Sequence, residues 1–135
     1  MRKSDFEKLK SLKSLASRFA RYIYFRSMSS ANSALAEVAR RTSKLGDAGR
    51  GFYEALRGIQ LAVASSDQNS FYLRLYKYAE PSEIEALRDK FTAEILRETA
   101  DAYERGYALA WSIVLETMAR LKVSHPPEEL TSQQR

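Results

Sequence analysis

The chain has 135 residues, which suffices for one domain with one hydrophobic core. It contains no cysteine, and this excludes a disulfide scaffold, a thiolate metal site and a thiol nucleophile. Because Ala, Leu, Glu, Lys, Arg and Ser dominate and Gly and Pro number only 5 and 3, the composition predicts an all-α protein. We expect a compact bundle of about five helices with a long C-terminal helix.

The net charge of +5 is unevenly distributed along the chain. Residues 1–60 contain 13 Lys and Arg against 5 Asp and Glu, whereas residues 61–135 contain 9 against 12. A basic half beside a mildly acidic half indicates a polyanion on one face and a protein neighbour on another. The alternative is a solvated surface whose charge is merely uneven.

The first expected helix begins at a capping box, Ser4-Asp5-Phe6-Glu7, and runs to a break at residues 27–30. Cations fall beside or opposite its apolar stripe, and Tyr22 and Phe25 fall among these cations. The stripe repeats at three- and four-residue steps and consists of Phe6, Leu9, Leu12, Ala16, Phe19, Ala20 and Ile23.

Two further helices are expected at about 31–45 and about 47–65, separated by Gly46 as a left-handed C-cap. Cations in the last turns of the first of these helices suit the helix dipole, which is the structural explanation for them. The inward residues of the two helices are Leu35, Val38 and Ala39, followed by Phe52, Leu56, Ile59 and Val63.

The segment FYLRLYKYAE, residues 71–80, combines four aromatic residues with two cations. Its pattern fits either a strand or a short helix. The chain offers no convincing second strand to pair with it, so we predict a short helix that ends before Pro81.

A capping box at Ser82–Glu85 predicts a long helix that runs to about Val123 and bends near Gly106. The second half of this helix is apolar nearly all round, so it is either buried or part of a subunit interface. We therefore expect one helical domain over residues 1–123 and a disordered tail over residues 124–135.

The sequence offers little support for catalysis or metal binding. Its only histidine is His125, so it has neither a catalytic triad nor a Glu-x-x-His metal pair, and it has no Gly-rich phosphate loop. Four carboxylates fall near one face of the long helix, where a solvated surface is the ordinary explanation: Glu94, Glu98, Asp101 and Glu104. We expect no enzymatic activity, no metal and no cofactor.

One short motif favours a different function. Residues Arg120 to His125 fit the Arg-x4-His pattern of HEPN ribonucleases, which are small helical proteins that cut RNA. A polar residue usually follows the arginine in that family, and a further helix follows the histidine. Here Leu121 and Pro126 occupy those places, so a ribonuclease remains a weaker alternative.

Cations interleaved with aromatic residues give the stronger signal, because phosphates are neutralised by Lys and Arg while unpaired bases stack on aromatic rings. We expect Phe25, Tyr72 and Tyr76 to supply rings beside the cations. The alternative is that the tyrosines are half-buried edges of the core. The candidate RNA-binding residues are Arg18, Arg21, Tyr22, Arg26, Arg40, Arg41, Lys44, Arg50, Arg57, Arg74 and Lys77.

Three short stretches carry a family resemblance: Thr42-Ser43-Lys44-Leu45, Arg50-Gly51-Phe52-Tyr53-Glu54 and Arg57-Gly58-Ile59. They resemble the small helical subunit of type III CRISPR effector complexes, and the type III-A form is the most similar. This chain differs by an extra Gly46-Asp47-Ala48-Gly49 and by Gly58 at a position that is usually basic.

The resemblance implies a subunit without catalytic activity that stacks as a filament along the guide–target duplex and contacts the RNA backbone without sequence preference. Arg50 and Arg57 match the basic positions of that family. The expected partners are therefore RNA, as guide RNA or guide–target duplex, together with other protein subunits or further copies of the chain.

Alternatives remain open. A helical adaptor could self-associate without nucleic acid through the apolar second half of the long helix, and helices around Gly46 could form a DNA-binding helix-turn-helix. The amino terminus lacks the apolar part of a secretory signal, and the apolar run at residues 107–115 is too short to span a bilayer. We therefore expect a cytoplasmic protein that has no membrane contact.

Overall fold

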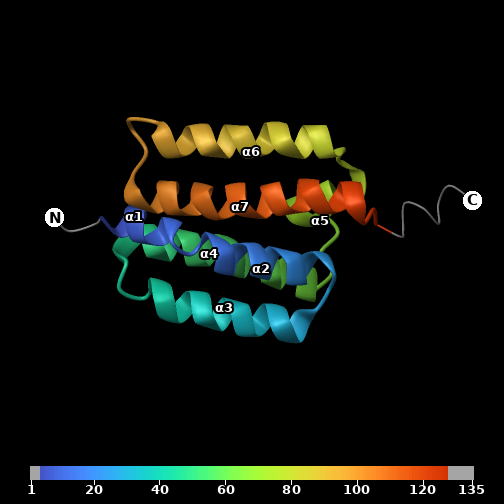
Figure 1. The fold of residues 1–135 in the computed structure, drawn as a ribbon, viewed down its shortest axis with the longest axis horizontal. Helices are drawn as coiled ribbons and strands as arrows, with labels where there is room; N and C mark the ends of the chain where they lie inside the picture. The colour runs from blue at the N-terminus through green and yellow to red at the C-terminus, as the bar shows by residue number, and fades with distance from the viewer. Residues whose placement is uncertain (1–3, 128–135) are drawn as a thin grey trace, which may run out of the picture.

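The computed structural model describes residues 4–127. Within these residues the chain forms seven helices and no strand (Figure 1), so the all-α class is confirmed and the expected number of about five helices is wrong. The helices are α1 (Asp5–Lys10), α2 (Lys13–Tyr24), α3 (Met28–Thr42), α4 (Gly46–Ala64), α5 (Phe71–Tyr78), α6 (Pro81–Leu96) and α7 (Ala102–Ser124).

The bundle is arranged around α7, which packs against α6 on one side and against α4 and α2 on the other (Figure 1). At the opposite edge from α6, α3 packs on α2 and α4. The inward stripes predicted for α2 and α4 are buried as expected. The largest side chains of the core include Phe19, Ile23, Phe52, Leu56, Tyr72, Leu115 and Met118.

The first predicted helix is divided in two. The Ser4 hydroxyl caps α1 as expected by accepting from the Glu7 amide at 3.1 Å. The helix then ends at Ser11, whose amide and hydroxyl both bond to the Lys8 carbonyl, at 3.2 Å and 2.6 Å. A tight turn follows and α2 starts at Lys13, so the apolar stripe continues while the backbone helix does not.

The C-terminal helix is long, with 23 residues in α7, but it is not the single helix predicted from residue 82 to about Val123. Residues 81–124 form two antiparallel helices, α6 and α7 (Figure 1). The reversal occurs at residues 97–101, where a capping box formed by Asp101 and Glu104 starts α7. The capping box of α6 lies earlier than predicted, between Glu80 and Glu83, with Pro81 in the first turn.

The helix α7 continues unbroken through Gly106. This glycine lies where α7 crosses α4, and a Cβ atom there would overlap the carbonyl oxygen of Ala48. Gly51 on α4 meets the carbonyl of Tyr103 in the same way. The two glycines therefore let the backbones of α4 and α7 approach more closely than side chains would allow.

The short helix predicted for FYLRLYKYAE is confirmed as α5. At its N-terminus the Ser70 hydroxyl accepts from the Leu73 amide at 3.2 Å. At its C-terminus the buried Lys122 of α7 donates from Nζ to the carbonyl oxygens of Leu75, at 3.0 Å, and Ala79. A cation on terminal carbonyls suits the helix dipole, so α5 is held at both ends.

The last helix continues through Ser124, one residue beyond the predicted end of the domain. Of the expected disordered tail, residues 128–135 lie outside the described part of the chain. Among the helices of residues 4–127, none combines the length and the apolar character needed to cross a bilayer.

Candidate nucleic-acid interface

The structure distributes the predicted RNA-binding residues over distinct parts of the surface. One set lines a groove between α2 and α3, which we call the α2–α3 groove. A second set meets at the end of the bundle, in what we call the end hollow. The remaining residues lie outside both linings.

The α2–α3 groove has a volume of about 450 Å³. On α2, the apolar stripe faces the core and leaves Arg18 and Tyr22 on the flank. On α3, Arg41 and a set of serines form the facing wall. The lining residues are Leu15, Arg18, Tyr22, Ser29, Ser30, Ser33, Ala34, Glu37 and Arg41.

The charge of this groove is set by several arginines around one carboxylate. Arg40 Nε donates to Glu37 at 3.2 Å, and Arg41 forms a 3.8 Å ion pair with the same carboxylate. The hydrogen bond from Arg40, followed by the charges of Arg40, Arg41 and Arg18, holds the pKa of Glu37 below its ordinary value. One ionised carboxylate thus faces three guanidinium groups, and the local charge stays positive.

The groove reaches the first turn of α3, where Ser29 and Ser30 line it. No side chain caps this helix N-terminus. Its unpaired amides and the positive end of the helix dipole add to the field of Arg18 and Arg41. Sequence reasoning missed these serines, since SMSS (residues 27–30) was interpreted only as a break between helices.

The end hollow joins the two predicted clusters of cations and aromatics, one from the end of α2 and one from α5. Its volume is about 470 Å³. The residues that line it come from α2, the α2–α3 turn, α5 and the end of α7, and they are Tyr24, Phe25, Arg26, Tyr76, His125, Pro126 and Pro127.

The rings around the hollow meet edge to face. Tyr24 lies 5.1 Å from Phe25 and 5.2 Å from Tyr76, and Phe25 lies 5.3 Å from His125, measured between ring centroids. The Arg26 guanidinium lies 4.6 Å from the Tyr76 ring centroid. Such arrangements are favourable for both ring pairs and cation–ring pairs.

Two polar contacts fix this end of the bundle. The Tyr24 hydroxyl donates to the backbone carbonyl of His125, which ties the end of α7 to α2. The His125 ring is held in turn by a 2.8 Å contact between Nδ1 and the Ser124 hydroxyl. Burial raises the pKa of Tyr24 to about 12, so its hydroxyl keeps its proton at neutral pH.

Arg26 has a left-handed backbone, with φ of 60°. Its amide bonds to the Ile23 carbonyl at 3.1 Å and the Ser27 amide to the Tyr22 carbonyl at 2.8 Å, which is the Schellman ending of a helix. Glycine is usual at this position, since a Cβ there costs roughly 1 kcal/mol or more. The contact between Arg26 and the Tyr76 ring stabilises the folded chain by roughly 0.5–1 kcal/mol and so offsets part of this cost.

The prediction that Tyr72 offers an exposed ring for base stacking is wrong. Tyr72 is only 2% exposed and belongs to the core, because α5 packs the face that carries Tyr72, Leu73 and Leu75 against the bundle. The aromatic residues that α5 exposes are Phe71 and Tyr78. An eight-residue helix gives too short a pattern to define its inner face from sequence.

The cations carried over from the family resemblance lie on α4 and line neither site. Arg50 forms ion pairs with Asp47 at 3.5 Å and Glu54 at 3.9 Å, and its guanidinium lies 4.6 Å from the Tyr103 ring centroid. Arg57 is exposed on the same helix.

The other candidate cations also lie apart from the groove. Lys44 is exposed in the connection between α3 and α4, and Arg74 is exposed on α5, while Lys77 is half-buried there. On α2, Arg21 lies 5.5 Å from the Phe25 ring centroid, at the edge of the end hollow.

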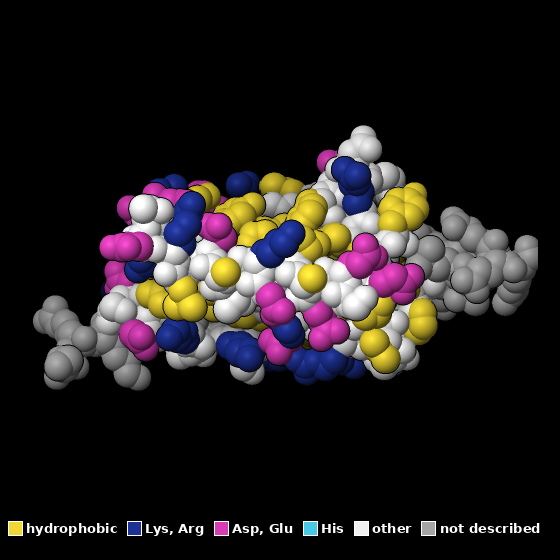
Figure 2. Space-filling view, turned by 90° about the horizontal axis from the view of Figure 1, so that it is seen from above, with side chains coloured by type: hydrophobic (Ala, Val, Ile, Leu, Met, Phe, Trp, Pro, Cys, Tyr) yellow, Lys and Arg dark blue, Asp and Glu magenta, His cyan; other side chains and the backbone are white. Residues whose placement is uncertain are grey.

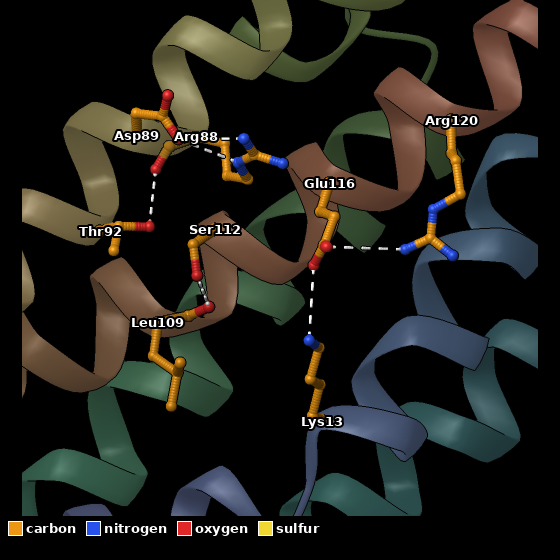
Figure 3. Close-up of polar contacts among 8 residues, drawn as sticks. All are labelled: Lys13, Arg88, Asp89, Thr92, Leu109, Ser112, Glu116 and Arg120. Carbon is orange, nitrogen blue, oxygen red and sulfur yellow. Dashed lines mark hydrogen bonds and ion pairs between the residues drawn. The ribbon is translucent and has the colours of Figure 1, made fainter.

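Arg120 and His125 make separate contacts. Figure 3 shows Arg120 and Lys13 both directed at Glu116, with ion pairs of 3.7 Å and 3.6 Å. His125 instead faces Phe25. Two cations thus share one carboxylate here as they do at Glu37, and on α6 Arg88 pairs with Asp89 at 3.0 Å.

The carboxylates predicted to form a solvated face are divided by the turn between α6 and α7. Glu94 and Glu104 both pair with Arg97, at 3.2 Å and 2.6 Å. Across residues 4–127, no three His, Asp or Glu side chains come together as a set of metal ligands.

Comparison with known proteins finds no match for the chain, whether with protein families, curated proteins or solved structures. The cationic, hydroxyl-bearing groove and the aromatic hollow can bind phosphate and a planar ring, respectively.

Proposed function

We propose that this chain is a non-catalytic RNA-binding protein that contacts the phosphate backbone in the α2–α3 groove. The observation that supports this most is the composition of the groove. Arg40 and Arg41 pair with the carboxylate of Glu37, and Arg18 lines the same groove. Serine hydroxyls line the wall beside Tyr22. Cations and hydroxyls are the groups that bind phosphate oxygens.

Binding of this kind is independent of base sequence, because phosphates are the same at every nucleotide. Its free energy comes largely from the release of counterions, so affinity falls steeply as salt rises. We further propose that the chain acts in the cytoplasm as a subunit of a larger ribonucleoprotein. The resemblance to CRISPR small subunits supports this assembly, with guide RNA or a guide–target duplex as the ligand.

The test is the binding of a fluorescein-labelled, unstructured RNA at several salt concentrations, beside DNA of the same sequence. Arg18→Ala combined with Arg41→Ala should weaken binding at least about tenfold at low salt and reduce the salt slope by about 2. The loss should be equal for unrelated RNA sequences.

The matched control is Arg88→Ala combined with Lys90→Ala, which removes the same charge from α6. It should leave affinity nearly unchanged. An equal loss in both variants would show that only total charge matters. Absence of RNA binding by the wild type at low salt would contradict the proposal outright.

A self-associating adaptor is the second candidate, and one observation favours it. Trp111 lies between Phe71 and Phe91, at ring distances of 5.3 Å and 5.9 Å, and Phe71 is 45% exposed. Figure 2 shows hydrophobic side chains gathered in the middle of the face that carries α6. Trp111 itself is buried, so Phe71 is the member of this cluster that reaches the surface, and exposed apolar side chains of this kind serve protein contacts.

The interface predicted for this adaptor is wrong, however. The apolar second half of the long helix is α7, and its residues Trp111 to Leu115 are buried inside the bundle against α2, α4 and α6. Light scattering decides between the candidates. A stable oligomer that persists in high salt and binds no RNA would favour the adaptor.

A further inference from the structure

We propose that the end hollow binds one unpaired nucleotide of the RNA whose backbone occupies the α2–α3 groove. This inference rests on the proposed function and adds to it a second subsite with a different chemistry. The base would stack on the ring of Phe25, and the phosphate would pair with the guanidinium of Arg26.

The size and chemistry of the hollow fit this ligand. About 470 Å³ is enough for a nucleotide, and the walls combine rings, a cation and an imidazole. Phe25 is 41% exposed although it is a large apolar side chain at a helix end. Unpaired bases are commonly bound by stacking on such rings and on arginine planes.

The backbone of Arg26 supports a role for its side chain in binding. The residue occupies the left-handed position of the Schellman ending, where glycine would fit without strain. Its contact with the Tyr76 ring only offsets the strain. The guanidinium also donates to the Ile23 carbonyl at 3.4 Å, at the end of α2. Glycine would avoid the strain altogether, whereas arginine adds a charged group that can pair with a phosphate. Strained residues of this kind are concentrated at functional sites.

The position of the hollow connects it to the groove. The α2–α3 turn, residues 25–27, separates the two: Arg26 lines the hollow, and Ser29 and Ser30 line the groove just beyond the turn. In Figure 1 this turn lies at the same end of the bundle as the end of α7. An RNA strand that leaves the groove at this end would reach the turn that carries Phe25 and Arg26.

The hollow is also largely pre-formed. The bond from the Tyr24 hydroxyl to the His125 carbonyl and the two amide bonds of the Schellman ending fix three of its walls. A site that is rigid before binding orders few groups on binding, which favours affinity for a small ligand.

The test is an NMR titration of the full chain, labelled with ¹⁵N, with adenosine 5′-monophosphate. Ribose 5-phosphate serves as the ligand that lacks a base. The nucleotide should shift the amides of Phe25, Arg26, Tyr76 and His125 in a saturable way. Ribose 5-phosphate should bind at least about tenfold more weakly, since base stacking contributes most of the affinity.

Two variants locate the site. Phe25→Leu keeps an apolar side chain and Arg26→Gly restores the residue that the backbone favours, and each should weaken nucleotide binding at least about tenfold. The melting temperature of Arg26→Gly should be equal to or above that of the wild type. A lower one would show that Arg26 is structural and would overturn the argument from strain.

Ser66→Gly is the matched control. Ser66 has φ of 54° and occupies the same left-handed position at the end of α4. This variant should raise the melting temperature and leave nucleotide binding unchanged. If it weakened binding as much as Arg26→Gly does, the effect would be general and the assignment to the hollow would be wrong.

The remaining outcomes separate the two proposals. Nucleotide shifts in the groove alone, no saturable binding, or equal binding of ribose 5-phosphate would overturn the hollow proposal and leave the groove untouched. If the nucleotide bound in the hollow while long RNA did not bind at all, the groove proposal would fail. The hollow would then take a free nucleotide, contrary to the inference that the base belongs to the bound strand.

Discussion

Two regions of the bundle differ in how their helices meet. The crossing of α4 and α7 is a contact between backbones, whereas the α2 side is formed by long side chains. At the crossing, Gly51 and Gly106 bring two backbones together, and an added Cβ at either would overlap a carbonyl group of the other helix. On the α2 side, the contacts are made by rings, guanidinium groups and hydroxyls at the ends of side chains. Two open volumes, of about 450 and about 470 Å³, remain between them.

The difference shows where the chain can vary without unfolding. The two helices can approach closely at the crossing because Gly51 and Gly106 have no side chains, so an added Cβ at either position is not tolerated. The α2 side presents groups that the core does not need, such as Arg18, Phe25 and Arg41, which are exposed. Substitutions at the crossing should therefore change stability, and substitutions on the α2 side should change binding.

The largest effect is expected from Gly106→Ala. Because its Cβ would meet the backbone at Ala48, α4 and α7 must move apart, at a cost of about 3 kcal/mol in the free energy of unfolding. Denaturation with urea, followed by circular dichroism, measures this cost.

Gly58→Ala is the control for that change. Nothing lies within 4 Å of a Cβ at this position in the middle of α4, so alanine should raise the free energy of unfolding by about 0.5–1 kcal/mol. If both alanine variants were equally tolerated, close backbone approach would not explain the crossing.

The second prediction concerns the buried lysine that ends α5. Lys122→Met keeps the length of the side chain but removes the donors to the carbonyls of Leu75 and Ala79, at a cost of about 1–3 kcal/mol. Hydrogen exchange should show faster exchange in α5 than in α4. Exchange that rose equally in all helices would mean that Lys122 supports the whole core rather than α5.

The pH dependence of stability tests the tie between α2 and α7. Since burial raises the pKa of Tyr24 to about 12, the stability that depends on its proton is complete below pH about 10. It is then lost as pH rises towards about 12. The free energy of unfolding of the wild type should therefore fall relative to that of Tyr24→Phe across this window. A constant difference between the two would contradict a folded-state shift at Tyr24.

The sequence predicted the interior of α2 and α4 well, because each carries an apolar stripe over more than three turns. It failed at helix boundaries whose signals are short. Asp101 and Glu104 form a capping box that is present in the sequence, but the apolar run on either side of it favoured one continuous helix. Likewise α1 ends at Ser11 inside an uninterrupted apolar stripe.

Among the candidate site residues, helical spacing brings together those that lie on one helix face. Arg18 and Tyr22 are one turn apart on α2, so their shared groove follows from helical spacing. The hollow could not be predicted, because it brings His125 against Phe25 from the other end of the chain. Such a contact depends on how α2, α5 and α7 pack, which no local pattern encodes.

The smallest change in RNA affinity is expected from a substitution at Glu37, which tests whether its ion pairs with Arg40 and Arg41 limit binding. Glu37→Gln removes the carboxylate that Arg40 and Arg41 share, so more positive charge is available to phosphates. RNA affinity should rise about two- to five-fold at low salt, and the gain should vanish at high salt, since exposed ion pairs are weak and screened.

Asp47→Asn is the matched control for Glu37→Gln, because it removes one exposed carboxylate from the ion pairs of Arg50 on α4. If RNA is bound in the α2–α3 groove, this variant should leave affinity unchanged. An equal gain in both variants would place phosphate contacts on α4 as well, at the arginine that the family resemblance selects. If only Asp47→Asn raised RNA affinity, release of Arg40 and Arg41 from Glu37 would have no effect on binding. The interface would then lie on α4 and not in the groove.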